Sequence, residues 1–246
     1  MGHRSGMRVA GVDACRRGWV AVSLAAVSLA PGGPAVAVRV GPSLEALLAP
    51  DPDLAGTTPP ELDMTGTTIV GIDMPLGLLE AGWRVADRAA RGLLGPRRSC
   101  VFAIPPRAVW AETSYPAANQ RCRELTGQGF SMQAWGLRAK LLEANRYRQM
   151  CGHPLYEVHP ELAFGAMAGA PLAASKHTSP GRDERRRLLA RVGLEIPRDI
   201  PATLIGDVLD AAAVAWSARR IAAGQAVTVP AIPQHDDQGA EIAIRF

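Results

Sequence analysis

Acidic residues at the ends of apolar segments are the side chains of this sequence that could do chemistry. Asp13 follows "RVAGV" and Asp73 follows "TIVGI", and each segment has the apolar character of a buried strand. Glu157 lies in a third strand-like segment, "LYEV". A charge at the end of a buried strand is costly unless another group compensates it. The three acids therefore predict a site where something neutralises them.

Two more acids, Asp207 and Asp210, interrupt a long apolar helical segment near the end of the chain. Their spacing of three places both side chains on one helical face. Taken singly, each of the five acids could instead cap a turn, form an ion pair or interact with a helix dipole. Taken together, carboxylates that converge at one sheet edge repel one another unless a cation neutralises them. We therefore expect Asp13, Asp73 and Asp210 to bind Mg²⁺ or Mn²⁺, with Glu157 and Asp207 assisting in catalysis.

Basic residues in two irregular stretches could bind the substrate of such a site. The net charge of +4 permits a polyanionic partner without requiring one. Candidates for phosphate contacts are Arg97, Arg98 and Arg107 in a proline-marked stretch, and Lys176 and Arg182 in a later loop. Divalent ions held by carboxylates catalyse phosphodiester hydrolysis. We expect a metal-dependent phosphodiester hydrolase whose partner is nucleic acid or another phosphoester.

The order of secondary structure predicts an α/β fold. Three strands that should pair antiparallel come first, followed by a short helix, a strand that ends at Asp73, several helices, a fifth strand and further helices. This order matches a ribonuclease H-like mixed five-stranded sheet, with three antiparallel strands, then parallel strands, and helices on both faces, although order alone does not separate it from other α/β folds. The expected strands cover 7–14, 18–27, 35–40, 67–72 and part of 154–160, with a last strand at 241–246. The expected helices cover 43–49, 83–95, 115–127, 131–150, 160–169, 181–193 and 203–224.

One domain over residues 7–246 is expected, with a helical insertion at about 80–150 and a disordered leader at 1–6. No apolar run is long enough to span a bilayer, and the leader has no apolar core of a secretory signal. The four cysteines show no CxxC spacing, which favours reduced thiols in a cytoplasmic protein. The apolar helix expected at 203–224 could form a homodimer interface or belong to the core.

Six segments resemble the DUF429 family, which is described as predicted ribonuclease H-like nucleases. They are "GVDACRRGWVAV", "GIDMPLGL", "RAARGLLGPRRSCVFAIPPR", "GFSMQAWGLRAKLLE", "YEVHPELAF" and "DVLDAAAVAWSARRIAAG". The resemblance implies catalytic acids on the first strand, the fourth strand and a late helix, which here are Asp13, Asp73 and the Asp207/Asp210 pair. The helix with two acids is similar to that of RuvC-type resolvases. Glu157 is implied nearby as a family feature.

Two other functions remain open from the sequence. An actin-like phosphotransferase or ATPase shares the opening strand order, but it normally has glycine-rich hairpin loops for phosphates, and "DACRRG" is a poor one. A non-catalytic metal-binding or nucleic-acid-binding protein could also retain the acids around a structural ion. The sequence does not choose among DNA, RNA, a branched junction and a small phosphoester, because no base-reading motif is present.

Overall fold

The computed structural model describes residues 8–24, 36–49 and 68–246. The predicted leader at 1–6 and the connections at 25–35 and 50–67 lie outside these ranges. The strands are β1 (Arg8–Cys15), β2 (Gly18–Leu24), β3 (Val36–Gly41), β4 (Thr68–Ile72), β5 (Leu155–Glu157), β6 (Thr228–His235) and β7 (Glu241–Arg245). The α-helices are α1 (Leu44–Leu48), α2 (Val85–Leu94), α3 (Tyr115–Thr126), α4 (Met132–Gly136), α5 (Arg138–Met150), α6 (Pro160–Ala168), α7 (Ser179–Arg191) and α8 (Ile205–Ala222). Two 3₁₀ helices, η2 (Gly95–Cys100) and η3 (Arg107–Ala111), follow α2.

The chain divides into two compact units. The first comprises residues 1–73, 151–226 and Phe246, and the second comprises 74–150 and 227–245. The helical insertion expected at about 80–150 falls in the second unit, which also takes in β6 and β7. All five acids singled out from the sequence belong to the first unit.

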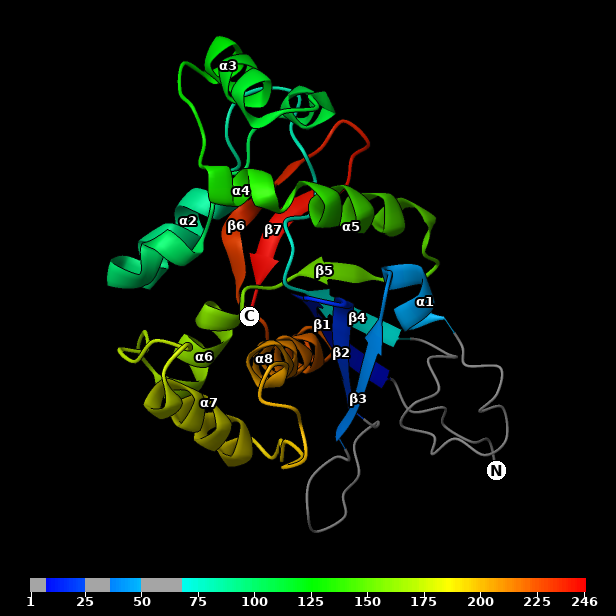
Figure 1. The fold of residues 1–246 in the computed structure, drawn as a ribbon, viewed down its shortest axis with the longest axis vertical. Helices are drawn as coiled ribbons and strands as arrows, with labels where there is room; N and C mark the ends of the chain where they lie inside the picture. Colours follow the sequence, from blue (N-terminus) through cyan, green and yellow to red (C-terminus); the bar gives the residue numbers. More distant parts are fainter. Residues whose placement is uncertain (1–7, 25–35, 50–67) are drawn as a thin grey trace. The chain divides into compact units, whose positions relative to one another are not determined.

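A five-stranded sheet forms the centre of the first unit (Figure 1). Its strand order is β3-β2-β1-β4-β5. The pairs β1–β2 and β2–β3 are antiparallel, whereas β1–β4 and β4–β5 are parallel. The predicted ribonuclease H-like sheet, with three antiparallel strands followed by parallel ones, is confirmed. Because parallel neighbours end at the same edge, β1 and β4 bring the residues that follow them together.

Helices cover both faces of this sheet. Helix α8 lies across β1, β2 and β4, and α6 and α7 pack against α8 on the same side. The core on this side includes Val20 and Val22 of β2, which alternate with Trp19 and Ala21 on the opposite face. Trp19 pairs with Gly41 of β3, and a Cβ on Gly41 would touch Leu47 of α1. Helix α1 therefore covers the face opposite α8.

Two glycines allow α8 to lie directly on the sheet. Gly11 of β1 and Gly71 of β4 are register partners. A Cβ on Gly11 would lie 2.1 Å from the backbone nitrogen of Ala215 and 2.2 Å from the carbonyl oxygen of Ala211. A Cβ on Gly71 would lie 2.8 Å from Cγ1 of Val214. The helix thus approaches the two strands more closely than any side chain would permit.

The second unit consists of helices and a two-stranded sheet. Its strands β6 and β7 pair antiparallel, so the strand predicted at 241–246 is confirmed as β7, in a sheet of its own. The single helix predicted at 131–150 is wrong, because the chain forms α4 and α5 with a break at Leu137. Ser131 caps α4 by accepting from the backbone nitrogen of Ala134, and the nitrogen of Leu137 donates to the carbonyl of Ala134, which tightens the last turn. In the part of the chain that the structure describes, no helix has the length and apolar character needed to cross a membrane.

Candidate carboxylate site of the first unit

Asp13 and Asp73 lie side by side where β1 and β4 end. The backbone nitrogen of Asp73 donates to the carbonyl of Val12 at 2.8 Å, which extends the pairing of the two strands as far as the acids. Each acid comes two residues after a glycine that faces α8, Gly11 or Gly71. Since side chains two apart share a face of a strand, both carboxyls project toward α8.

Asp210 approaches the same place from the helix. Ala211 and Ala215 lie over Gly11, and Asp210 stands at the end of α8 that reaches the carboxyl ends of β1 and β4. The Asp210 side chain is 3% exposed. Asp207 lies in the first turn of α8 and is half-buried. The close contact of α8 with the sheet is therefore what brings the helical acids to the strand acids.

A lysine from a loop neutralises part of this cluster. The Nζ of Lys176 donates to Oδ2 of Asp210 at 2.6 Å. Its ammonium also acts electrostatically on Asp13 and Asp73. We predicted Lys176 as a phosphate contact, but in this structure its head group is the partner of an acid. The compensating charge expected for the buried acids is thus supplied at least in part by the chain itself.

The charges of these carboxyl groups act on one another. Burial, followed by the charges of Asp73 and Asp210, raises the pKa of Asp13 well above its usual range, and Lys176 opposes the shift. Burial and the charge of Asp210 raise the pKa of Asp73 to about 7. Burial and Asp210 also raise the pKa of Asp207. Burial alone would lower the pKa of Lys176, but its bond to Asp210 and the charges of Asp73 and Asp13 outweigh burial and raise it.

Glu157, which we expect to assist in catalysis, lies in β5, and the strand register decides which face of the sheet it occupies. In β5 it pairs with Ile72, whereas Tyr156 pairs with Gly71. Register partners share a face, so Glu157 projects to the face opposite Gly71 and Asp73. Besides Asp210, Glu161 in the first turn of α6 acts on Asp73 and contributes to the raised pKa of Asp73.

Glu161 forms a buried ion pair that sequence reasoning missed. Nη2 of Arg185 donates to Oε1 of Glu161 at 2.6 Å, and the Arg185 side chain is 1% exposed. A cluster of arginines such as Arg185–Arg187 usually forms a solvated face, but Arg185 is buried. Leu188 and Leu189, three and four positions later, are also buried, so the helical spacing of Arg185 with two leucines was the available signal.

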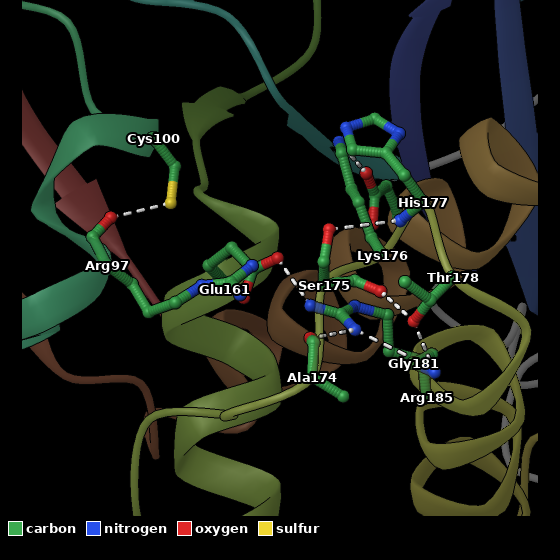
Figure 2. A network of polar contacts seen from close by, with 11 residues as sticks. Arg97, Cys100, Glu161, Ala174, Ser175, Lys176, His177, Thr178, Gly181 and Arg185 are labelled. Atoms are coloured by element: carbon green, nitrogen blue, oxygen red, sulfur yellow. Dashed lines mark hydrogen bonds and ion pairs between the residues drawn. The ribbon is translucent and has the colours of Figure 1, made fainter.

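The remaining predicted substrate contacts lie elsewhere. Arg182 of α7 donates to the carbonyl of His177 at 2.9 Å, beside Lys176. Arg97, Arg98 and Arg107 belong to the second unit. In η2, Arg98 is exposed, and the carbonyl of Arg97 accepts from Sγ of Cys100 at 2.7 Å (Figure 2). Arg107 bridges two acids of its own unit, at 2.9 Å to Glu80 and 2.7 Å to Asp237.

The donor atoms of the cluster fit a divalent ion, but their present arrangement favours the lysine. Asp13, Asp73 and Asp210 offer oxygen ligands, which Mg²⁺ and Mn²⁺ prefer. Within residues 8–24, 36–49 and 68–246, no three His, Cys, Asp or Glu side chains are arranged to hold a metal ion as they stand. One of the two carboxylate oxygens that Asp210 could offer to such an ion, Oδ2, accepts a hydrogen bond from Lys176.

Fold and site together define an α/β protein with a ribonuclease H-like sheet and a buried carboxylate cluster at the ends of β1 and β4. A family model matches residues 11–235, and the chain belongs to that family, DUF429, which is described as a protein of unknown function. The match covers both units, so the acids and the second unit are parts of one family architecture. No curated protein and no solved structure matches the chain.

Proposed function

We propose that the chain is a metal-dependent phosphodiester hydrolase that acts on nucleic acid. The observation that carries the proposal is the convergence of Asp13, Asp73 and Asp210 from two strands and a helix at one point. Burial and the neighbouring carboxylates raise the pKa of Asp13 and Asp73 in spite of Lys176, so ionising all three acids needs more positive charge than one lysine supplies. A divalent cation is the natural way to keep such a cluster ionised.

The ion would be Mg²⁺ or Mn²⁺ held by Asp13, Asp73 and Asp210. When bound, it would supply positive charge for the phosphoryl oxygens and for an attacking water. The residues of the chain hold and orient this donor set. Gly11 and Gly71 let α8 carry Asp210 to the strand ends. Asp207, one turn earlier on the helix, lies within electrostatic reach of Asp210 and assists it.

The wider proposals about partners and location rest on the same site. Arg97, Arg98, Arg107 and Arg182 are proposed to contact the phosphates of the substrate, and the basic net charge supports this. All four cysteines are free, which supports a reducing, cytoplasmic location. A homodimer is retained as a proposal that oligomeric state in solution would test.

A second candidate is a binding protein in which Lys176 is the permanent counter-ion of the acids. The 2.6 Å bond between Lys176 and Asp210 favours it, because the pair needs no metal. The phosphotransferase alternative has less support. Gly18, in the turn after β1, has a φ of 127°, and a Cβ there would lie 2.3 Å from the carbonyl oxygen of Gly41. Gly18, the first residue of β2, thus serves the close contact of β2 with Gly41 of β3.

Cleavage of a substrate panel in the presence of Mn²⁺ tests the proposal. The panel contains duplex DNA, single-stranded DNA, RNA, an RNA–DNA hybrid and a four-way junction. The variant is Asp73→Asn, and the matched control is Asp199→Asn, which makes the same change at an exposed acid of the same unit. We expect Mn²⁺-dependent cleavage that is lost in Asp73→Asn and kept in Asp199→Asn. Cleavage of no substrate by a protein that still binds Mn²⁺ would contradict the nuclease assignment.

A further inference from the structure

Lys176 enters the carboxylate cluster from the solvent. Its side chain is 41% exposed, whereas that of its partner Asp210 is 3% exposed. The ammonium group therefore meets a buried oxygen at the end of a side chain that is partly exposed to water. Rotation about the side-chain bonds of Lys176 can carry the ammonium from Asp210 toward the solvent.

The backbone that carries Lys176 is fixed on both sides (Figure 2). Before it, the carbonyl of Ala174 accepts from Nη1 of Arg185 at 3.2 Å. The carbonyl of Ser175 accepts from Oγ1 of Thr178 at 2.8 Å and from its backbone nitrogen at 3.1 Å. After it, the carbonyl of His177 accepts from Arg182. These hydrogen bonds hold the backbone on both sides of Lys176. The Lys176 side chain extends from this loop to Asp210.

Arg185 connects the loop that carries Lys176 to α6 and α7. Besides Ala174, its guanidinium bonds the carbonyl of Gly181 at 3.0 Å and the carboxylate of Glu161 at 2.6 Å. The close contact of the loop with α7 also requires a glycine, because a Cβ on Gly181 would lie 2.0 Å from the carbonyl oxygen of Ser175. The backbone next to Lys176 is therefore held by contacts with α6 and α7 in addition to the bond to Asp210.

The residue type at position 176 also favours an exchangeable contact. The sequence has 27 Lys and Arg, of which only Lys140 and Lys176 are lysines. An arginine here could bind a carboxylate with two parallel hydrogen bonds and hold it firmly. A lysine offers a compact ammonium on a flexible stem, which makes a single, more easily exchanged contact. The chain places one of its two lysines where a releasable cation would be needed.

We infer that Lys176 is an exchangeable counter-ion, which neutralises the acids in the metal-free protein and withdraws from Asp210 when a divalent ion binds. This inference rests on the proposed metal site. It assigns Lys176 as a positioning residue that sets metal affinity, because each binding event must displace the ammonium. The bond between Lys176 and Asp210 then stabilises the cluster when no metal is bound, and it lowers the affinity of the cluster for the ion.

Titration of Mn²⁺ into variants of the full chain by calorimetry tests the exchange. We expect Lys176→Met to bind Mn²⁺ about tenfold more tightly than the unmodified protein, and Lys176→Arg to bind it more weakly. Lys140→Met, the same change at the other lysine, which pairs with Glu143 at 3.8 Å, should leave the affinity unchanged. Equal affinity in all four proteins would overturn the exchange and leave the metal site standing. Absence of Mn²⁺ binding in every protein would overturn the exchange and the proposed function together.

A second readout does not depend on the folding of a Lys176 variant. The unmodified protein is acetylated briefly with and without Mg²⁺, and the two lysines are compared by mass spectrometry. Exchange predicts that Mg²⁺ raises the labelling of Lys176 severalfold relative to Lys140, because the ammonium is released from its ion pair. An unchanged ratio at a Mg²⁺ concentration that saturates the site would overturn it.

Discussion

Replacing Gly11 with alanine should damage the site by moving the helix that carries Asp210. The new methyl group would lie 2.1 Å from the nitrogen of Ala215, 2.2 Å from the carbonyl oxygen of Ala211 and 2.7 Å from the Cα of Ala215. These are backbone atoms of one helix, so no rotamer change can relieve the overlap. Helix α8 must therefore move away from β1, and the core residues between α8 and the sheet must repack.

The size of the effect follows from what each position contacts. Overpacking a core costs about 1–3 kcal/mol and occasionally more, and we expect Gly11→Ala to cost about 3 kcal/mol or more. For a chain of this length, that lowers Tm by about 6–12 °C. Gly71→Ala meets the side chain of Val214 at 2.8 Å, which can adjust, so we expect about 1–2 kcal/mol. At Gly206, in the first turn of the same helix, nothing lies within 4 Å, and alanine should raise stability by up to about 1 kcal/mol.

Urea unfolding of Gly11→Ala, Gly71→Ala and Gly206→Ala measures the order of their free energies of unfolding directly. Where a variant remains folded, its affinity for Mn²⁺ should fall in the same order, because displacement of α8 separates Asp210 from the strand acids. Gly206→Ala is the control for a glycine-to-alanine change at which the new methyl group meets no neighbouring atom. A Gly11→Ala protein as stable as Gly206→Ala would refute the claim that α8 lies directly on β1.

Three further results are expected. Because burial and the charge of Asp210 raise the pKa of Asp73 to about 7, the folded protein favours the protonated acid, so metal-free protein should lose stability as pH rises from about 4 to about 7. Urea unfolding in EDTA at pH 5 and pH 8 should show this loss reduced by about 2–4 kcal/mol in Asp73→Asn, and an equal loss in both proteins would contradict it. Arg185→Met leaves the carboxylate of Glu161 buried without its cation and should cost about 3–5 kcal/mol, part of which Glu161→Gln should restore in the double variant. If the double variant were no more stable than Arg185→Met, the pair would not be the cause. Arg107→Met breaks two exposed ion pairs and should cost less than about 1 kcal/mol, a difference that 1 M NaCl should remove. A larger, salt-insensitive loss would show that Arg107 is held by packing instead.

The strand acids could be predicted because strand pairing follows from the sequence order. The sequence order predicts three antiparallel strands and then a strand that joins the sheet through a crossover, which places β1 beside β4. Asp13 and Asp73 lie near the carboxyl ends of these two strands. The pattern Gly-X-Asp occurs at both ends, in "GVD" and "GID", and carries its own information. The glycine marks a close approach of backbone, and the acid two residues later must share its face.

Other parts of the site depend on features that one sequence does not specify. Glu157 lies in a strand of three residues, and shifting its register by one would reverse its face, so its placement could not be predicted from pattern alone. Lys176 reaches Asp210 across 34 positions from a loop whose course is set by Arg185, Thr178 and Gly181. These tertiary contacts leave no periodic signal. The ion pair of Arg185 was the exception, because its spacing with buried leucines was visible.

Anomalous diffraction from a crystal of the protein grown with Mn²⁺ tests the central claim most directly. The account predicts a manganese peak in contact with carboxylate oxygens of Asp13, Asp73 and Asp210, at about 2.0–2.3 Å, the range of hard cations bound by oxygen. It also predicts that Nζ of Lys176 has moved away from Asp210. A cluster without manganese, in which Lys176 still bonds Asp210 at saturating Mn²⁺, would contradict the account.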